Sequence, residues 1–448
     1  MLIESISGVR GIFPSDLDAA VAVRYARAFL RFCPGEKIMI GRDTRPSGAE
    51  LVSAITAGLE SVGASVRDCG ICPTPTFQFA VEDTDAHGGI MVTASHNPAE
   101  WNGLKFVGAD GCFLTAGEFG QLLHGLRTEG DTGKAAPGSY SRFDRAGFRH
   151  IHRILSLGWL DVERIRQRNF SVAVDAVNGA AGDILPLLLE KLGCTVVRIH
   201  CDLSGRFARH PEPLPEHLEA LQETVRHRRC DVGFAVDPDG DRLAIVDESG
   251  RPLGEEYTLV FAVDEVLSGA DVPPVVVTNL STTRAVDDVS RRYGAAVHRT
   301  AVGEIHVVEA MKHHAASIGG EGNGGVILKD VHLGRDSLVA AALVLGRMAR
   351  SERPVGKIFD SFPSYVMVKE RVPTGESKPA EFLGAVAAAF PRATQDRGDG
   401  LKLMWSDRWV HIRPSNTEPI IRIYAESKTE EEARELVKRV KEILLAYG

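Results

Sequence analysis

Short apolar runs, each followed by a polar turn and then by a helical pattern, recur along most of this chain. Strands that alternate with helices in this way predict mixed, largely parallel sheets whose faces are covered by helices. Ligands of such sheets bind near the ends of the strands. The predicted fold class is therefore α/β. The apolar runs span residues 37–41, 171–174 and 274–277, and the helical patterns span residues 17–32, 48–62, 180–192 and 337–348.

The length of 448 residues exceeds what one compact core accommodates, so several domains are expected. A Gly- and Ala-rich stretch at 128–141 and prolines at 354 and 363 indicate joints between them. Residues 428–447 have the spacing of a closing helix. We predict three similar α/β domains with mixed sheets, followed by a smaller α+β domain. Their predicted bounds are 1–148, 149–250, 251–362 and 363–448.

The charge and the hydropathy pattern exclude some classes of partner. A net charge of −8 gives no overall attraction to nucleic acid. No apolar run approaches the roughly 18 residues that span a bilayer, and Glu4 and Arg10 interrupt the N-terminal segment where a secretory signal would be apolar. We therefore predict a cytoplasmic protein whose partner is a small ligand, with no nucleic acid and no membrane.

The first of four polar loops is residues 93–98, Thr-Ala-Ser-His-Asn-Pro, which follows an apolar run at 89–92. Small and polar residues closed by a proline form a tight exposed turn, in which the Ser95 hydroxyl can meet a ligand. An ordinary turn with a capping serine explains the same residues. The glycines of a hydrolase nucleophile elbow do not flank Ser95, so an esterase triad is not indicated.

The second loop carries Asp237, Asp239 and Asp241 between two apolar runs. In an extended loop alternate side chains share a face, so the three carboxylates are expected to converge. Converging carboxylates repel one another unless a cation lies between them, and their hard oxygen atoms favour Mg²⁺ or Ca²⁺. An EF-hand is excluded because its sixth position is Arg242 rather than glycine and because strand-like segments flank the loop. A solvated acidic turn is the alternative.

The third and fourth loops offer hydrogen-bonding groups for a sugar and a phosphate. Residues 319–325 are so rich in glycine that the backbone can approach a ligand closely, and Glu321 and Asn323 suit sugar hydroxyls, although a flexible turn has the same composition. Residues 413–419 are predicted to form a phosphate-binding loop with guanidinium, hydroxyl and amide groups. Its candidate ligands are Arg413, Ser415, Asn416 and Thr417, with Arg422 on the strand that follows.

With these four loops in this order, the sequence resembles the α-D-phosphohexomutase superfamily. The resemblance begins at the segment Ser-Gly-Val-Arg-Gly at 7–11, includes Gly-Arg-Asp-Thr-Arg at 41–45 and reaches the loop at Arg413. The resemblance implies a heart-shaped protein of four domains, each contributing one loop to a central active site. It implies a phosphoserine at Ser95 and one Mg²⁺ held by Ser95 together with Asp237, Asp239 and Asp241.

The same resemblance assigns the remaining groups. It implies that Arg10, His96, Lys105 and Arg242 lie near the transferring phosphoryl group. It implies sugar contacts from Glu321 and Asn323, and a second phosphate held by the loop at Arg413. Lys105 is the leading candidate for acid–base catalysis, which requires cationic surroundings that lower the pKa of its ammonium group.

The reaction that the resemblance implies is the interconversion of hexose 1-phosphate and hexose 6-phosphate through a hexose 1,6-bisphosphate, which also serves as activator. The form Gly-Glu-Gly-Asn-Gly-Gly at 320–325, with Gly325 where several bacterial members have histidine, is similar to archaeal-type phosphoglucosamine mutases and phosphomanno/phosphoglucomutases, and the chain most resembles the first of these groups. Phosphoglucosamine mutase is therefore the first prediction, and a dual phosphomannomutase/phosphoglucomutase is the alternative. A non-catalytic sugar-phosphate sensor and a metal-dependent phosphatase are the alternatives of other classes.

Overall fold

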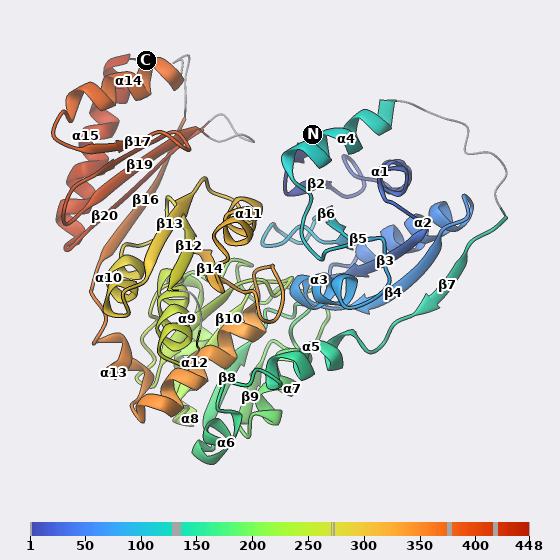
Figure 1. Ribbon diagram of the computed structural model, residues 1–448, viewed down its shortest axis with the longest axis horizontal. Coiled ribbons are helices and arrows are strands. Elements are labelled where there is room, and N and C mark those ends of the chain that lie inside the picture. The colour runs from blue at the N-terminus through green and yellow to red at the C-terminus, as the bar shows by residue number, and fades with distance from the viewer. Residues whose placement is uncertain are drawn as a thin grey trace.

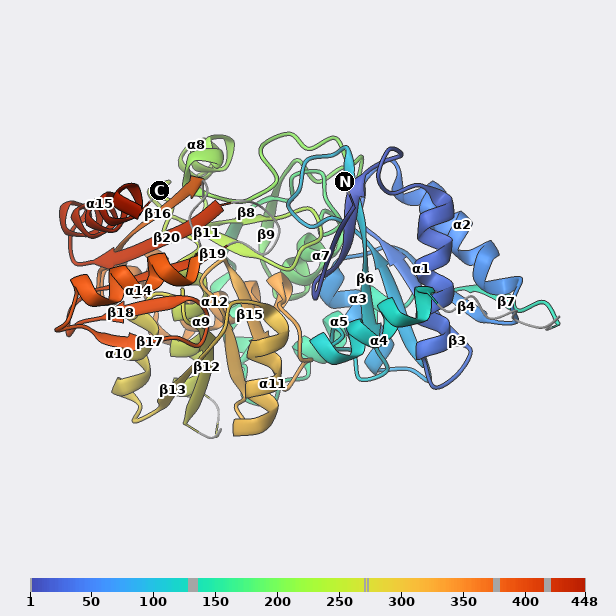
Figure 2. The ribbon, with the colours of Figure 1, turned by 90° about the horizontal axis from the view of Figure 1, so that it is seen from above.

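The computed structural model describes residues 2–127, 136–269, 271, 274–373, 379–414 and 420–447. It contains four separate β-sheets, which follow one another along the chain (Figure 1). We refer to the domains built on them as domains I to IV. Domain I and domain IV lie at opposite sides of the molecule, with domains II and III between them, in both views (Figures 1 and 2).

Domain I contains a seven-stranded mixed sheet with the strand order β1-β2-β6-β5-β3-β4-β7. The pairs from β5 to β7 are parallel, and those from β1 to β5 are antiparallel. The strands are β1 Ile3–Ser5, β2 Gly8–Ile12, β3 Lys37–Arg42, β4 Ser65–Ile71, β5 Gly88–Val92, β6 Trp101–Gly108 and β7 Ser139–Arg142, and the helices are α1 Ala19–Phe32, α2 Gly48–Glu60, α3 Thr74–Glu82 and α4 Ala116–Arg127.

Domains II and III each contain a four-stranded mixed sheet, in the orders β11-β10-β8-β9 and β13-β12-β14-β15. Each sheet has one antiparallel edge strand, β11 in domain II and β15 in domain III. The strands are β8 Ser171–Asp175, β9 Thr195–Ile199, β10 Val232–Val236, β11 Leu243–Asp247, β12 Val275–Asn279, β13 Ala296–Thr300, β14 Ile318–Glu321 and β15 Gly325–Leu328. The helices are α5 Ala146–Leu155, α6 Val162–Arg168, α7 Ile184–Lys191, α8 Glu219–Arg228, α9 Glu256–Gly269, α10 Ala285–Arg292, α11 Glu304–His314, α12 Ser337–Ser351 and α13 Val355–Phe359.

Domain IV is a five-stranded antiparallel sheet in the order β16-β20-β19-β18-β17, with its helices on one face (Figure 1). This α+β domain and the three mixed-sheet α/β domains confirm the predicted fold class. The strands are β16 Val366–Pro373, β17 Thr394–Asp396, β18 Leu401–Met404, β19 Trp409–Pro414 and β20 Ile420–Ser427, and the helices are α14 Pro379–Ala389 and α15 Glu430–Tyr447.

The apolar cores show which domains are joined. One cluster of buried side chains runs without interruption from the sheet of domain II, through α9 and α12, to the sheet of domain III. The main cores of domain I and domain IV are separate clusters. Domains II and III therefore form one packed body, and domains I and IV attach to it through interfaces.

One local prediction was wrong. Residues 319–325 were expected to form one loop, but Gly319 to Glu321 belong to β14 and Gly325 begins β15. A Cβ atom on Gly319 would lie 2.6 Å from the Met311 sulfur, so this glycine permits close packing inside a sheet and does not mark a turn.

Among the described residues, none of the helices combines the length and the apolar character that crossing a lipid bilayer requires.

Candidate active site

Asp237, Asp239 and Asp241 lie in the turn between β10 and β11 and are buried, with at most 1% of their surface exposed. Gly240 has a φ of 66°, which lets the short loop reverse direction. One oxygen from each of the three carboxylates lies within 4.8 Å of the others. The spacing of alternate residues therefore produces the convergence that the sequence predicts.

The electrostatics of this loop suit a divalent cation. Burial, together with the neighbouring carboxylates of Asp241 and Asp239, raises the pKa of Asp237 well above its usual range. Burial also acts to raise the pKa of Asp239, but the Lys105 ammonium group outweighs it and the pKa falls. The Oδ1 atoms of Asp239 and Asp241 are buried without a hydrogen-bond partner in the described part of the chain. Such oxygen atoms fit a hard divalent cation such as Mg²⁺.

Ser95 lies in the connection between β5 and β6 and faces the aspartate loop. Its Oγ is 3.4 Å from Asp237 Oδ2 and 3.3 Å from His96 Nδ1. Its φ of 51° is in the left-handed region, which is uncommon for a residue with a side chain and is maintained only where the surroundings fix the backbone. The hydroxyl is therefore presented to the carboxylates by a constrained loop.

Arg45 supplies this constraint, a role that the sequence did not reveal. Its guanidinium is fully buried and donates to the carbonyl oxygens of Ser95 at 2.7 Å and Asn97 at 2.6 Å, and also to those of Pro98 and Trp101. Asp43 pairs with Arg45 at 3.0 Å and accepts a hydrogen bond from Thr93. The motif at 41–45 belongs to the resemblance, but only the fold brings Arg45 under the serine loop.

Lys105, on β6, points into the aspartate loop. Its Nζ lies 2.7 Å from Asp239 Oδ2 and 3.7 Å from Asp241 Oδ2. The prediction that Lys105 acts in acid–base catalysis required cationic surroundings. The ion pairs of its ammonium group are instead with carboxylates, because β6 places Lys105 beside the aspartate loop, residues 237–241, which we also call the metal loop.

The other predicted cationic groups lie around Ser95. Arg10 on β2 donates to Asn97 Oδ1 at 3.2 Å, and Arg242 pairs with Glu212 at 2.9 Å. Burial, with Arg242 and Arg10 close by, lowers the pKa of His96 well below its usual range, so its imidazole is neutral at pH 7. A neutral imidazole can accept a hydrogen bond from the Ser95 hydroxyl.

The sugar-loop candidates Glu321 and Asn323 lie together at the end of β14. Glu321 Oε1 accepts hydrogen bonds from Asn279 at 2.8 Å and from the backbone of Gly303 at 3.0 Å. Asn323 donates to Glu321 Oε2 at 3.3 Å and accepts from the backbone N–H of Gly325 at 3.1 Å. Both side chains are thus held in place by neighbouring groups of domain III.

Arg335 is a second residue that the sequence analysis missed. It lies just before α12, and its guanidinium contacts three carboxylates: Asp241 at 2.6 Å, Glu321 at 2.8 Å and Glu304 at 3.0 Å. It therefore joins the metal loop of domain II to the sugar loop of domain III. Nothing in the local sequence marks Arg335, because its partners are distant in the chain.

Arg413 and Arg422 lie directly opposite each other on β19 and β20, and Arg371 on β16 lies opposite Arg422. Directly opposite residues share one face of an antiparallel sheet, so the three arginines form a row, of which Arg371 was not predicted. Asp399 connects Arg413, at 3.1 Å, to the backbone of Val302, at 3.0 Å. The predicted ligands Ser415, Asn416 and Thr417 lie outside the described residues.

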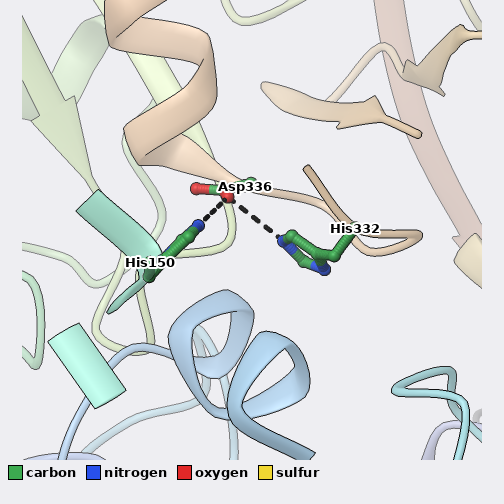
Figure 3. Close-up of side chains that lie close together, drawn as sticks. All are labelled: His150, His332 and Asp336. Atoms are coloured by element: carbon green, nitrogen blue, oxygen red, sulfur yellow. Dashed lines mark hydrogen bonds and ion pairs between the residues drawn. The ribbon is translucent and has the colours of Figure 1, made fainter. Parts of the chain in front are cut away.

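A further buried cluster, made of His150, His332 and Asp336, lies next to Arg335 (Figure 3). Asp336 Oδ2 lies 2.8 Å from His150 Nε2 and 3.1 Å from His332 Nε2. The Asp336 Oδ1 atom accepts hydrogen bonds from the backbone of Leu338 and Val339 at the start of α12. Both imidazoles thus point at one carboxylate oxygen at hydrogen-bonding distance, which anchors the residue next to Arg335.

Comparison with known proteins identifies the family. Models of the phosphoglucomutase/phosphomannomutase family match the chain in four consecutive parts. They are the three alpha/beta/alpha domains, I at residues 3–121, II at 149–250 and III at 254–365, and the C-terminal domain at 367–443.

Relatives match over almost the whole chain. A phosphoglucomutase/phosphomannomutase of Thermococcus kodakarensis is 36% identical over 438 residues, which cover 96% of each chain. A probable phosphoglucosamine mutase of Methanopyrus kandleri is 34% identical over 442 residues, 96% of this chain and 95% of the relative. The crystal structure of a phosphoglucomutase/phosphomannomutase family protein of Burkholderia thailandensis superposes with a TM-score of 0.86 at 28% identity, covering 100% of this chain and 98% of that one.

The four matched domains, and relatives above 30% identity over nearly the full length, account for all four domains of the structure. The chain therefore belongs to the α-D-phosphohexomutase superfamily and is a phosphohexomutase, an intramolecular phosphotransferase that acts on sugar phosphates.

Proposed function

We propose that this phosphohexomutase works through a phosphoserine at Ser95, with glucosamine phosphate as its preferred substrate. The observation that carries the phosphoserine is the position of the Ser95 hydroxyl, 3.4 Å from a carboxylate oxygen of Asp237 on a loop that Arg45 constrains. An exposed turn serine that only caps the chain needs no such surroundings.

In the proposed reaction the phosphoryl group passes from Ser95 Oγ to the free hydroxyl of a bound hexose monophosphate. One P–O bond breaks while another forms, and the proton of the sugar hydroxyl ends on Ser95 Oγ. We assign Lys105 to the movement of this proton: its ammonium group would donate a proton to Ser95 Oγ, and the amine that remains would take up the proton of the sugar hydroxyl. The carboxylates that pair with Lys105 are those assigned to Mg²⁺, so a bound cation would add the positive charge that this role requires. The hexose 1,6-bisphosphate then reorients, and its other phosphoryl group returns to Ser95.

Charge neutralisation dominates a phosphoryl transfer. We assign Asp237, Asp239 and Asp241, together with the Ser95 phosphate, to one Mg²⁺. When bound, the metal ion neutralises negative charge on the transferring group. Arg10 and Arg242 lie on the same side of the site and supply further positive charge, while the neutral imidazole of His96 accepts a hydrogen bond.

The two ends of the substrate are held by different domains. We assign the sugar hydroxyls to Glu321 and Asn323 in domain III. We assign the phosphate that is not transferred to domain IV, where a single site serves whichever phosphate faces away from Ser95. Its proposed ligands are Arg413, Ser415, Asn416, Thr417 and Arg422.

The preference for glucosamine phosphate is supported by charge. Three carboxylates, those of Asp241, Glu321 and Glu304, surround the one guanidinium of Arg335. Asp241 is assigned to the metal ion, but the carboxylates of Glu321 and Glu304 suit the ammonium group of a glucosamine better than a neutral hydroxyl. The probable phosphoglucosamine mutase at 34% identity supports the same substrate. The relative at 36% identity favours the second candidate, a dual phosphomannomutase/phosphoglucomutase.

The deciding experiment follows phosphorus NMR spectra of the purified protein with Mg²⁺ and a trace of glucose 1,6-bisphosphate. Glucosamine, mannose and glucose 1-phosphates are supplied separately. We expect the 6-phosphate signal to grow fastest with glucosamine 1-phosphate. A tenfold preference for mannose or glucose phosphate would replace the first candidate by the second. Inorganic phosphate released as fast as sugar is isomerised would instead indicate a phosphatase.

The phosphoserine is tested by a matched pair of substitutions. Ser95→Ala should keep the fold but lose nearly all turnover, and the mass of one phosphate should disappear from the intact protein. Ser53→Ala, at an exposed position on α2, is the control and should retain wild-type activity and phosphate content. Full activity in Ser95→Ala would show that another residue carries the phosphoryl group. If phosphorylated protein gave no 6-phosphate signal with any of the three sugars, a non-catalytic sensor would be favoured.

A further inference from the structure

Gly325 and Arg335 occupy one small volume beneath the sugar loop. A Cβ atom built on Gly325 would lie 2.3 Å from Arg335 Cδ and 2.9 Å from Arg335 Cγ. Real Cβ atoms do not approach other heavy atoms so closely, so any side chain at 325 would force the arginine to move. The backbone of Gly325 does not have a positive φ, so the glycine is needed for space and not for its conformation.

The arginine has little freedom to move elsewhere, because the backbone that follows it is fixed. The Asp336 backbone donates to the Val326 carbonyl at 2.8 Å, and the Asp336 carboxylate is anchored by His150 and His332 (Figure 3). Ser337 Oγ donates to the carbonyl of Gly240, inside the metal loop, at 2.6 Å. Three consecutive residues thus attach the start of α12 to the active site.

The guanidinium is shared between the two halves of the site. It contacts Asp241 of the metal loop at 2.6 Å and Glu321 of the sugar loop at 2.8 Å. Only 11% of the Arg335 side chain is exposed, and its three partner carboxylates are at most 7% exposed. A planar guanidinium can bridge several carboxylates at fixed angles, whereas the single ammonium group of a lysine cannot.

We propose that Arg335 is a positioning residue that fixes the metal loop relative to the sugar loop, and that Gly325 is its steric counterpart. This inference rests on the proposed roles of Asp241 and Glu321. The pair acts as one unit: a side chain at 325 displaces the guanidinium from Asp241 and has the same consequence as loss of Arg335 itself. The position of the Arg335 guanidinium therefore depends on the absence of a side chain at 325.

The pair is tested by a double-mutant cycle in which metal binding is read out without any sugar. Mn²⁺, which shares the oxygen ligands of Mg²⁺ and is observed by electron paramagnetic resonance, is titrated into wild type, Gly325→Ala, Arg335→Ala and the double variant. Removing or displacing a cation beside Asp241 should strengthen Mn²⁺ binding at least threefold in each single variant. The double variant should match Arg335→Ala alone.

Two controls separate this role from a general loss of structure. Gly117→Ala on α4 has open space around its new Cβ and should bind Mn²⁺ as the wild type does. Arg335→Lys keeps the positive charge, so it should retain a folded protein even if Arg335→Ala does not. With the sugar phosphate that the wild type converts fastest, Arg335→Lys should lower kcat at least tenfold with a smaller change in KM.

The result that overturns the proposal is wild-type Mn²⁺ affinity in Gly325→Ala, or a double variant in which the two single effects add. Because this arm uses no sugar, it decides the question even if no hexose phosphate tested is a substrate. Failure of the phosphoserine or of the substrate assignment would instead appear in the phosphorus NMR experiment.

Discussion

His411 is a buried side chain on β19 that ties domain IV to domain III. Its Nδ1 lies 2.8 Å from Ser281 Oγ, and its Nε2 donates to the Asp399 carbonyl at 2.6 Å. Burial lowers the pKa of His411 to about 4. In the unfolded chain the pKa of histidine is about 6.5. The folded state therefore binds fewer protons between these two values.

Because the folded-state pKa of His411 is depressed, its contribution to stability is present above about pH 6.5 and is lost as pH falls towards 4. We expect the free energy of unfolding of the wild type to fall by about 2 kcal/mol more than that of His411→Gln between pH 7.5 and 4.5. Urea unfolding at the two pH values measures this difference. His124→Gln, at an exposed position on α4, should lose as much as the wild type. Equal losses in wild type and His411→Gln would contradict the prediction.

At the scale of single elements, the arginine row on the sheet of domain IV makes a separate prediction. Arg371 lies opposite Arg422, which lies opposite Arg413. A charge-assisted contact with a phosphate contributes about 1 kcal/mol at an exposed position, so Arg371→Ala should raise KM for the sugar phosphate about three- to tenfold with little change in kcat. Initial rates measured against substrate concentration test this. Arg434→Ala, at an exposed position on α15, is the control and should leave KM unchanged. An unchanged KM in Arg371→Ala would show that Arg371 does not contact the phosphate.

The N-terminus of α12 depends on Asp336, whose two oxygens receive the histidines and the first backbone N–H groups of the helix. His150 also stacks on Phe79, with ring centroids 5.3 Å apart. His150→Phe keeps this stacking but removes one donor from a buried carboxylate, which should cost about 2–4 kcal/mol of stability.

Thermal and urea unfolding of His150→Phe measure that cost. His152→Phe changes an exposed residue of the same helix and should shift stability by about 0.5 kcal/mol or less. Wild-type stability in His150→Phe would mean that the carboxylate does not need this donor.

Periodicity was sufficient to predict several of the helices and strands. The helical patterns at 17–32, 48–62 and 337–348 correspond to α1, α2 and α12, and the apolar run at 37–41 to β3. The glycines at 319–320 were misassigned because a sequence does not distinguish a glycine that bends the chain from one that lets strands pack closely.

Without the family resemblance, the candidate site was predictable only where its residues are neighbours in sequence. Asp237, Asp239 and Asp241 share one loop, so their convergence follows from local geometry. Arg45, Arg335 and Arg371 act on partners brought close by the packing of different segments or by strand register. No spacing rule applies to such pairs, which is why the sequence did not reveal them.

At the scale of the whole molecule, the metal ion is expected to link activity with stability. Excess EDTA should abolish turnover, and Mg²⁺ should restore it. A ligand that binds only the folded state at 100 times its Kd stabilises that state by about 2.7 kcal/mol, so the thermal midpoint should rise with Mg²⁺. Asp239→Asn should show a much smaller rise. Full activity in excess EDTA would contradict a metal-dependent reaction.

The continuous core of domains II and III has a consequence for the intermediate. The aspartate loop, Glu321 and Arg335 all belong to this one body, whereas Ser95 and Arg413 belong to domains whose main cores are separate. In the reaction that we propose, the hexose 1,6-bisphosphate would therefore reorient against one rigid body that carries both the aspartate loop and Glu321. The groups that we propose for its two phosphates lie on domains I and IV, whose main apolar cores are separate from this body.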